Sequence, residues 1–255
     1  MQTPHITVTD LTMAYGDFVI QHGLNFTIDR GDVFIIMGGS GCGKSTLLKH
    51  LIGLQRPAKG DVFYNRRNFW QATAEERTKL MRRFGVLYQS GALFSSLTLA
   101  ENIALPMGEF TDLSRSEIAD IMSYKLALVG LAGFEDYYPA EISGGMQKRA
   151  GLARAMALDP EILFFDEPSA GLDPVSARLL DDLIIKLKET LGTTIVVVTH
   201  ELASIFSIGT NSVFLDSETK TMLATGNPKK LLAESKDSKI IQFLTRGEGN
   251  VNNEA

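Results

Sequence analysis

Nine consecutive residues have the types and spacing of a phosphate-binding loop. They fit the pattern G-x-x-x-x-G-K-[ST], in which glycines let the backbone N–H groups point inward at phosphate oxygens. The positive end of a following helix adds to this attraction. Lys44 is expected to reach the β- and γ-phosphates of a nucleoside triphosphate, and the Ser45 hydroxyl to ligate Mg²⁺. The predicted nucleotide-binding loop comprises Gly38, Gly39, Ser40, Gly41, Cys42, Gly43, Lys44, Ser45 and Thr46.

The flanking residues supply the strand and helix that such a loop needs. Residues 32–37 form a short apolar run, and residues 45–54 carry apolar side chains at helical spacing. A glycine-rich turn could match the motif by accident, in roughly one of a hundred chains of this length. The strand–loop–helix context favours a nucleotide site over that alternative.

Two adjacent carboxylates end a second apolar run. Residues 161–165 predict a central parallel strand, which Asp166 and Glu167 follow. The carboxyl ends of such strands face the ligand crevice of an open sheet. We expect Asp166 to hold Mg²⁺ through its water shell and Glu167 to polarise an attacking water near the γ-phosphate. The alternative is a pair of surface acids at a strand end.

Three further residues have a structural and a functional interpretation each. Tyr15 could stack on a base or pack at a turn, and packing is favoured by its position alone. His200 follows an apolar run at 194–198 and could contact a γ-phosphate or be structural. Asp173 precedes Pro174 at the start of a helical pattern with Val175, Leu179, Leu183 and Leu187 on one face, so it is a good N-cap.

The remaining pattern predicts an α/β fold. Residues 5–29 alternate as antiparallel strands do, and residues 84–89 form another buried strand. Residues 90–160 are mostly helical in pattern, with breaks at Pro106-Met107-Gly108, at 130–133 and at Pro139. We expect one domain over residues 1–245, with a helical subdomain of about 90–160 inserted in the core, and a polar tail at 246–255.

Composition excludes several classes of protein. Of 255 residues 44% are hydrophobic, too many for a disordered chain, and the net charge of −5 argues against a nucleic-acid partner. The single cysteine, Cys42, rules out an internal disulfide, and we interpret its thiol as filler. The first residues, Met-Gln-Thr-Pro-His, lack a signal peptide, and no apolar run reaches the ~18 residues of a membrane span. These features predict a cytoplasmic chain unless a partner holds it at a membrane.

The segment Ile142–Gln147 resembles the signature motif of ABC-type ATPases. The motifs have the family's order over about residues 5–245, which implies a RecA-like, mostly parallel core, an N-terminal antiparallel β subdomain and an inserted α-helical subdomain. The resemblance also implies ATP and Mg²⁺ as ligands and assigns residue roles. Tyr15 is implied to stack on adenine, with Ile20 beneath the ring, and Asp173 to contact the second copy of the dimer. Gln89 is implied to sense Mg²⁺ and the γ-phosphate, and Mg²⁺ to be ligated by Ser45, Gln89 and Asp166. The implied catalytic residues are Glu167, Gln89 and the switch histidine His200.

The signature implies a second copy of the chain. Ser143 and the N–H groups of Gly144 and Gly145 begin a helix and form a second anion site. In the family these residues, with Gln147, serve the ATP held by the partner's phosphate loop. A chain with one loop and one signature is therefore expected to form an isologous homodimer that sandwiches two ATP molecules.

A narrower resemblance is to the ATPase subunit of MCE (Mla-type) phospholipid transporters. It rests on the segment 88–94, the Ser-Gly-Gly-Met form of the signature, and residues 241–244. It implies a membrane permease, an MCE substrate-binding protein, glycerophospholipid cargo and a peripheral position on the cytoplasmic side of the inner membrane. Gly39 replaces the loop's common proline, and the tail after Leu244 only partly matches the family's ending, which embraces the opposite protomer.

Other functions stay open at this stage. The chain could serve another ABC importer or exporter, or be a soluble ABC ATPase without a permease. A GTPase or small-molecule kinase would leave the signature and His200 unexplained. For a transporter we expect a permease to dock near Gln89 and residues 90–110, where Ala92, Leu93 and Phe94 could line a groove or simply pack in the core.

Overall fold

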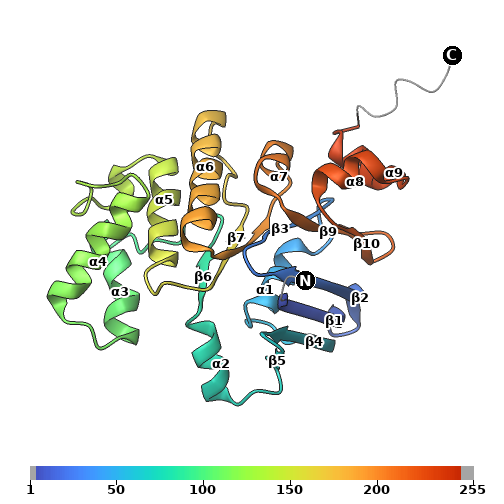
Figure 1. Cartoon of the computed structure of the whole chain (residues 1–255), viewed down its shortest axis with the longest axis horizontal. Coiled ribbons are helices and arrows are strands. Elements are labelled where there is room, and N and C mark those ends of the chain that lie inside the picture. The colour runs from blue at the N-terminus through green and yellow to red at the C-terminus, as the bar shows by residue number, and fades with distance from the viewer. Residues whose placement is uncertain (1–3, 248–255) are drawn as a thin grey trace. The chain divides into compact units, whose positions relative to one another are not determined.

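The computed structural model describes residues 4–247, which fall into two compact units. The first unit includes residues up to Arg77 and from Val196 onward, and the second is Thr78–Ile195. The division falls within helix α2 (Ala74–Met81), labelled in Figure 1, and within strand β8 (Thr194–Val198). The predicted tail at 246–255 lies almost wholly outside the described residues.

An antiparallel sheet forms one layer of the first unit. Its strand order is β2-β1-β4-β5, and the alternation predicted for residues 5–29 is confirmed. Ile6 lies opposite Ile28, Val8 opposite Phe26 and Leu11 opposite Leu24, and all six side chains are buried. The strands are β1 (Pro4–Tyr15), β2 (Phe18–Asp29), β4 (Lys59–Tyr64) and β5 (Arg67–Asn68).

Mostly parallel strands carry the predicted phosphate loop. Strand β3 (Val33–Gly38) is buried along its whole length and pairs in parallel with β9 (Asn211–Asp216). In this unit β3 lies between β9 and β8, and β10 (Thr221–Thr225) pairs with β9 antiparallel. Helix α1 (Lys44–Leu51) follows the loop, so the predicted strand–loop–helix is confirmed. The remaining helices are α7 (Leu202–Ile208), α8 (Pro228–Glu234) and α9 (Ser238–Leu244).

The second unit combines two parallel strands with a group of helices. Strand β6 (Phe84–Leu87) pairs with β7 (Ile162–Asp166), and it ends two residues before the predicted boundary. Figure 1 shows α3, α4 and α5 gathered together, as a helical subdomain requires. The helices are α3 (Leu99–Phe110), α4 (Arg115–Leu128), α5 (Gly144–Ala155) and α6 (Pro174–Leu191), with a short 3₁₀ turn at Pro139–Glu141.

The expected break at Pro106-Met107-Gly108 is wrong, because α3 continues through it. A proline inside a helix removes one N–H donor and costs about 3 kcal/mol. Here a capping box between Thr98 and Glu101 starts the helix, and burial of Leu99, Ile103 and Met107 holds it together. Packing therefore outweighs the local preference.

The apolar face predicted for α6 is buried only toward the C-terminal end of the helix. The buried hydrophobic positions are Leu180, Ile184 and Leu187, whereas Val175 is 70% exposed and Leu179 is 57% exposed. The helix thus presents two neighbouring apolar side chains to solvent near its N-terminus. Periodicity alone could not distinguish this exposed pair from the core face.

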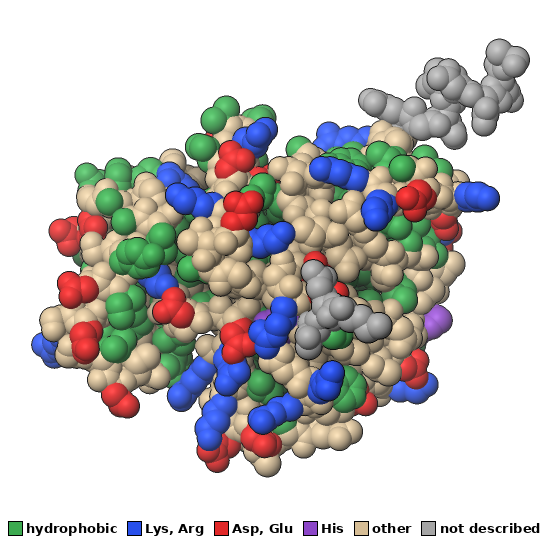
Figure 2. All heavy atoms as spheres, in the orientation of Figure 1, with side chains coloured by type: hydrophobic (Ala, Val, Ile, Leu, Met, Phe, Trp, Pro, Cys, Tyr) green, Lys and Arg blue, Asp and Glu red, His purple; other side chains and the backbone are tan. Residues whose placement is uncertain are grey.

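The predicted α/β class is confirmed, with parallel strands, an antiparallel sheet and helices. None of the helices within residues 4–247 is both long and apolar enough to cross a membrane. Acidic and basic side chains are interspersed on the face seen in Figure 2, in keeping with the modest net charge.

Candidate nucleotide site

The loop between β3 and α1 has a backbone that favours glycine at two key positions. Gly38 has a φ of 144°, and a Cβ there would lie 2.2 Å from the carbonyl oxygen of Leu215. Gly43 has a φ of 95°, and its Cβ would lie 2.6 Å from Cγ2 of Ile20. The chain therefore turns tightly into the N-terminus of α1, which is the cradle that phosphates need.

Lys44 folds over this loop. Its ammonium donates to the carbonyl oxygens of Gly38 and Gly39, at 3.0 Å each. Ser45 and Thr46 lie in the first turn of α1, and the Thr46 carbonyl accepts from Nδ1 of His50 at 2.8 Å. The Lys44 ammonium and the Ser45 hydroxyl, both predicted from the sequence to serve the phosphates and Mg²⁺, thus lie at the start of α1.

The thiol of Cys42 has a packing role in this loop. It is buried, with 1% of the residue exposed, and burial raises its pKa. A buried neutral thiol is a small apolar side chain, which agrees with its interpretation as filler.

Three other predicted residues lie in the same unit. Tyr15, at the end of β1, is 54% exposed and its hydroxyl donates to Oε1 of Gln55 at 3.1 Å. Ile20 on β2 lies against Gly43, as described above. His200 lies two residues after the end of β8 and is exposed, with Nε2 3.6 Å from Oε1 of Glu201.

Gln21 supports the phosphate loop and was not predicted. It is fully buried, and its side-chain amide donates to the carbonyl oxygens of Cys42 and Asp216, at 2.8 Å each. One side chain therefore joins the loop to the end of β9. The sequence could have indicated this role, because Gln21 is a polar residue at an inward-facing position of an alternating strand.

The two carboxylates and Gln89 lie in the second unit. Asp166 ends β7 and is half-buried; burial raises the pKa of Tyr88, and the charge of Asp166 raises it further. Glu167 has a φ of 49°, an uncommon left-handed conformation for a side chain of this kind. Such outliers often occur at functional positions. Gln89 is exposed in the segment after β6.

The signature residues start α5. Ser143 is its N-cap, with Oγ accepting from the N–H of Met146, and Gly144 and Gly145 form the first turn. Gln147 instead donates its side-chain amide to the carbonyl oxygens of Pro139, at 2.8 Å, and Ile142, at 3.4 Å. Ser143 and the two glycines lie at a helix N-terminus suited to an anion, whereas the Gln147 amide braces the preceding turn.

Asp173 has the predicted capping role. Its carboxylate accepts from the N–H groups of Val175 and Ser176, at 3.0 Å each, and Pro174 is the first residue of α6. The hydrogen bonds from Ser176 lower the pKa of this carboxyl group.

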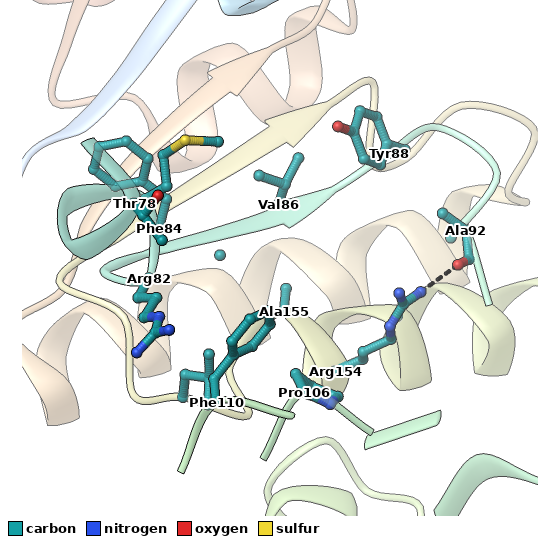
Figure 3. Close-up of a pocket in the computed structure, with 15 residues that line it drawn as sticks. Thr78, Arg82, Phe84, Val86, Tyr88, Ala92, Pro106, Phe110, Arg154 and Ala155 are labelled. Carbon is teal, nitrogen blue, oxygen red and sulfur yellow. Dashed lines mark hydrogen bonds between the residues drawn. The ribbon is translucent and has the colours of Figure 1, made fainter. Parts of the chain in front are cut away.

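A groove in the second unit has a volume of about 500 Å³. Figure 3 shows Val86 and Tyr88 on one side and Pro106 and Phe110 on the other, with Arg154 donating to the Ala92 carbonyl. Gln89, Leu93 and Phe94 do not line it, although Ala92 does. Cζ of Arg154 instead lies 4.7 Å from the centre of the Phe94 ring.

The residues suit a nucleotide better than a dedicated metal centre. Within the described part of the chain, no three His, Cys, Asp or Glu residues come together as metal ligands. Mg²⁺ commonly takes one or two protein oxygens and completes its shell with phosphate and water. The Ser45 hydroxyl and the Asp166 carboxylate are oxygen ligands of that type.

A family model described as "ABC transporter" matches residues 21–170. The chain belongs to the ABC transporter family.

Curated relatives extend the similarity along almost the whole chain. An intermembrane phospholipid transport system ATP-binding protein, MlaF, of Haemophilus influenzae is 39% identical, covering 95% of this chain and 90% of the relative. Its counterpart in Escherichia coli K12 is 36% identical, covering 94% and 88%. A probable ribonucleotide transport ATP-binding protein, mkl, of Mycobacterium tuberculosis is 42% identical over 94% of this chain. The match spans only 66% of that relative's length.

Solved structures agree with the fold. CbiO1 of Clostridium perfringens, part of an ABC transporter complex, has a TM-score of 0.83 at 27% identity, over 91% of each chain. MJ0796, a bacterial ABC transporter cassette solved as a dimer, has a TM-score of 0.78 at 30% identity, over 87% of this chain and 98% of that one.

Proposed function

We propose that this chain is the ATP-hydrolysing motor subunit of a transporter that moves phospholipid between the membranes of a Gram-negative envelope. The phosphate loop carries the proposal, because its positive-φ glycines and Lys44 form a tight turn suited to a nucleotide's phosphates. The phospholipid cargo is supported by two relatives named for it, each matched over most of its length. The mkl name favours ribonucleotide as a second candidate cargo.

The residues have separate roles in hydrolysis. The phosphate loop and Lys44 bind the phosphates, while Ser45, Gln89 and Asp166 serve Mg²⁺, which when bound neutralises charge on the phosphates. Glu167 orients or deprotonates the attacking water, and His200 contacts the γ-phosphate. Tyr15 stacks on adenine above Ile20. The exposure of Tyr15, 54%, supports stacking over core packing.

A second copy completes each site. Ser143, Gly144 and Gly145 bind the nucleotide held by the partner, and Asp173 lies at the contact. The exposed N-terminus of α5 supports this role, as does the solution of MJ0796 as a dimer. Closure on ATP and opening after hydrolysis form the mechanical stroke.

The groove beside β6 receives a helical segment of the membrane permease. Its apolar walls, Val86, Pro106 and Phe110, suit the apolar face of a short helix, and Phe110 is 48% exposed at its edge. This contact holds the chain on the cytoplasmic side of the inner membrane, in a complex that includes an MCE substrate-binding protein.

Replacement of Glu167 tests the hydrolytic role. Glu167→Gln keeps the shape of the side chain and removes its basicity, so ATP binding should persist while turnover falls by about 10²-fold or more. Phosphate release measures turnover, and a fluorescent ATP analogue measures ATP binding. Normal turnover in this variant would refute the role of Glu167.

Purification from native membranes tests the transport role. The tagged chain should bring down a permease and an MCE protein carrying phospholipid, and Phe110→Asp should weaken that recovery while Tyr124→Asp on α4 does not. A permease with bound ribonucleotide and no lipid would move the cargo to the second candidate. Recovery of only a soluble dimer would count against transport.

A further inference from the structure

Two cationic side chains of α5 bind the segment that follows β6. The Lys148 ammonium donates to the carbonyl oxygen of Gln89, and the Arg154 guanidinium donates to that of Ala92. All four residues lie in the second unit. The second of these bonds is visible in Figure 3. The signature helix is thus attached at two points to the backbone that carries Gln89.

The same segment packs directly on α5. A Cβ on Gly151 would lie 2.7 Å from the carbonyl oxygen of Gly91, so no larger residue fits there without movement. The N–H of Gly91 donates to the Tyr88 carbonyl at 2.8 Å, and Gly91 has a φ of 76°. Residues 88–91 therefore form a tight turn with little room to shift independently of the helix.

Lys148 differs from an ordinary surface lysine. It is 7% exposed, and burial of an ammonium is costly unless it finds polar partners. Burial lowers the pKa of Lys148, whereas the negative charge of Glu167 opposes that shift. The ammonium thus binds a carbonyl on the segment after β6 and is influenced by the charge of a carboxylate after β7.

Lys125 on α4 is a natural comparison. It is also buried, at 3% exposed, but its ammonium pairs with the exposed carboxylate of Asp159. Two buried lysines in one unit therefore have different partners, and only Lys148 contacts a residue assigned to hydrolysis.

We propose that Lys148 is a positioning residue for ATP hydrolysis. It ties the backbone of Gln89 to the signature helix, so that the position of α5 sets the position of the Gln89 side chain. This inference rests on the proposed roles of Gln89 and Glu167. Arg154 fixes the next turn of the same segment but contacts no residue assigned to hydrolysis.

The test replaces Lys148 in the full chain. Lys148→Met keeps most of the side-chain length and removes the donor. We expect kcat to fall by about 10²-fold, as for a small misplacement of a reacting group, while the KM for ATP changes little. Lys148→Arg, which restores a cationic donor, should recover most of kcat.

A second readout needs no nucleotide. Hydrogen exchange of the Gly91 amide, measured by mass spectrometry on peptides covering residues 88–92, should accelerate in Lys148→Met. Lys125→Met should leave both that exchange and kcat near wild type. Should Lys148→Met fail to fold, Lys148→Gln undergoes the same assays.

The outcomes separate this inference from the function on which it rests. Unchanged kcat in Lys148→Met, alongside lost turnover in Glu167→Gln, overturns the role of Lys148 alone. A rise in KM with faster exchange throughout the unit also overturns it, because that pattern indicates a general packing role. Normal turnover in Glu167→Gln instead overturns the proposed role of Glu167, on which this inference rests.

Discussion

At the scale of single residues, Gly38 is where the phosphate loop tolerates least change. A methyl group there would meet the Leu215 backbone, and its φ of 144° is unfavourable for any side chain. Gly38→Ala should lower the free energy of unfolding by about 2–4 kcal/mol from strain and overpacking. Urea unfolding measures the change. Gly39→Ala, where a Cβ meets nothing within 4 Å, should change it far less; equal losses would contradict the steric account.

Gln21 is a second residue whose loss should be measurable. Gln21→Leu leaves two buried carbonyl oxygens, those of Cys42 and Asp216, without this donor. We expect the free energy of unfolding to fall by about 1–3 kcal/mol and nucleotide affinity to weaken as the loop loosens. His22→Leu, on the exposed side of the same strand, is the control. Wild-type affinity in Gln21→Leu would show that the loop needs no such support.

Residue types predicted the phosphate loop, the two acids at the end of a strand and the Asp173 cap, because each depends on local spacing. The supporting residues Gln21 and Lys148 contact partners far along the chain, Asp216 and Gln89. Such contacts depend on how the elements pack, so the sequence alone did not predict them. For Lys148 the sequence offered one indication of burial: it lies four residues before Leu152, and so on the same face of the helix as that buried side chain.

At the scale of elements, α9 is attached to β9 by an ion pair. Lys239 donates to Asp216 at 2.9 Å and to Glu218 at 2.7 Å. Burial raises the pKa of Asp216, but hydrogen bonds from Thr219 and Lys239 outweigh it and lower that pKa to about 2.

This depressed pKa predicts acid sensitivity. The ionised Asp216 contributes stability above its unfolded pKa of ~4, and that contribution is lost as the pH falls toward 2. Lys239→Met should therefore lose less stability than wild type between pH 4 and pH 2, in denaturant unfolding followed by circular dichroism. Lys236→Met, at an exposed position, is the control, and identical pH profiles for Lys239→Met and wild type would contradict the assignment.

Element prediction succeeded for the buried strands and failed inside α3, and in α6 it did not predict which apolar residues are buried. A helix break was expected at Pro106, where packing sustains α3. Val175 and Leu179 share the apolar face predicted for α6, yet both are exposed. Local propensity and periodicity report what a segment prefers in isolation. They do not report which neighbour covers it.

At the scale of the whole molecule, the exposed pair on α6 has a use in the proposed dimer. Val175 and Leu179 are one helical turn apart and follow Asp173. In Glu167→Gln with ATP, we expect dimers by light scattering, and Leu179→Arg added to that variant should leave monomers. Leu191→Arg, at the other end of α6 and 47% exposed, is the matched control. Dimers that survive Leu179→Arg would exclude this surface from the interface.

The contact between the Lys44 ammonium and two loop carbonyls makes phosphate binding an exchange of partners. The ammonium leaves the neutral oxygens of Gly38 and Gly39 for charged ones. Charge-assisted hydrogen bonds are roughly twice as strong as neutral ones, so the net gain grows with the charge of the incoming group. In the proposed role of Lys44, a ligand must therefore outcompete the protein's own backbone, and the charge on its phosphates supplies the gain.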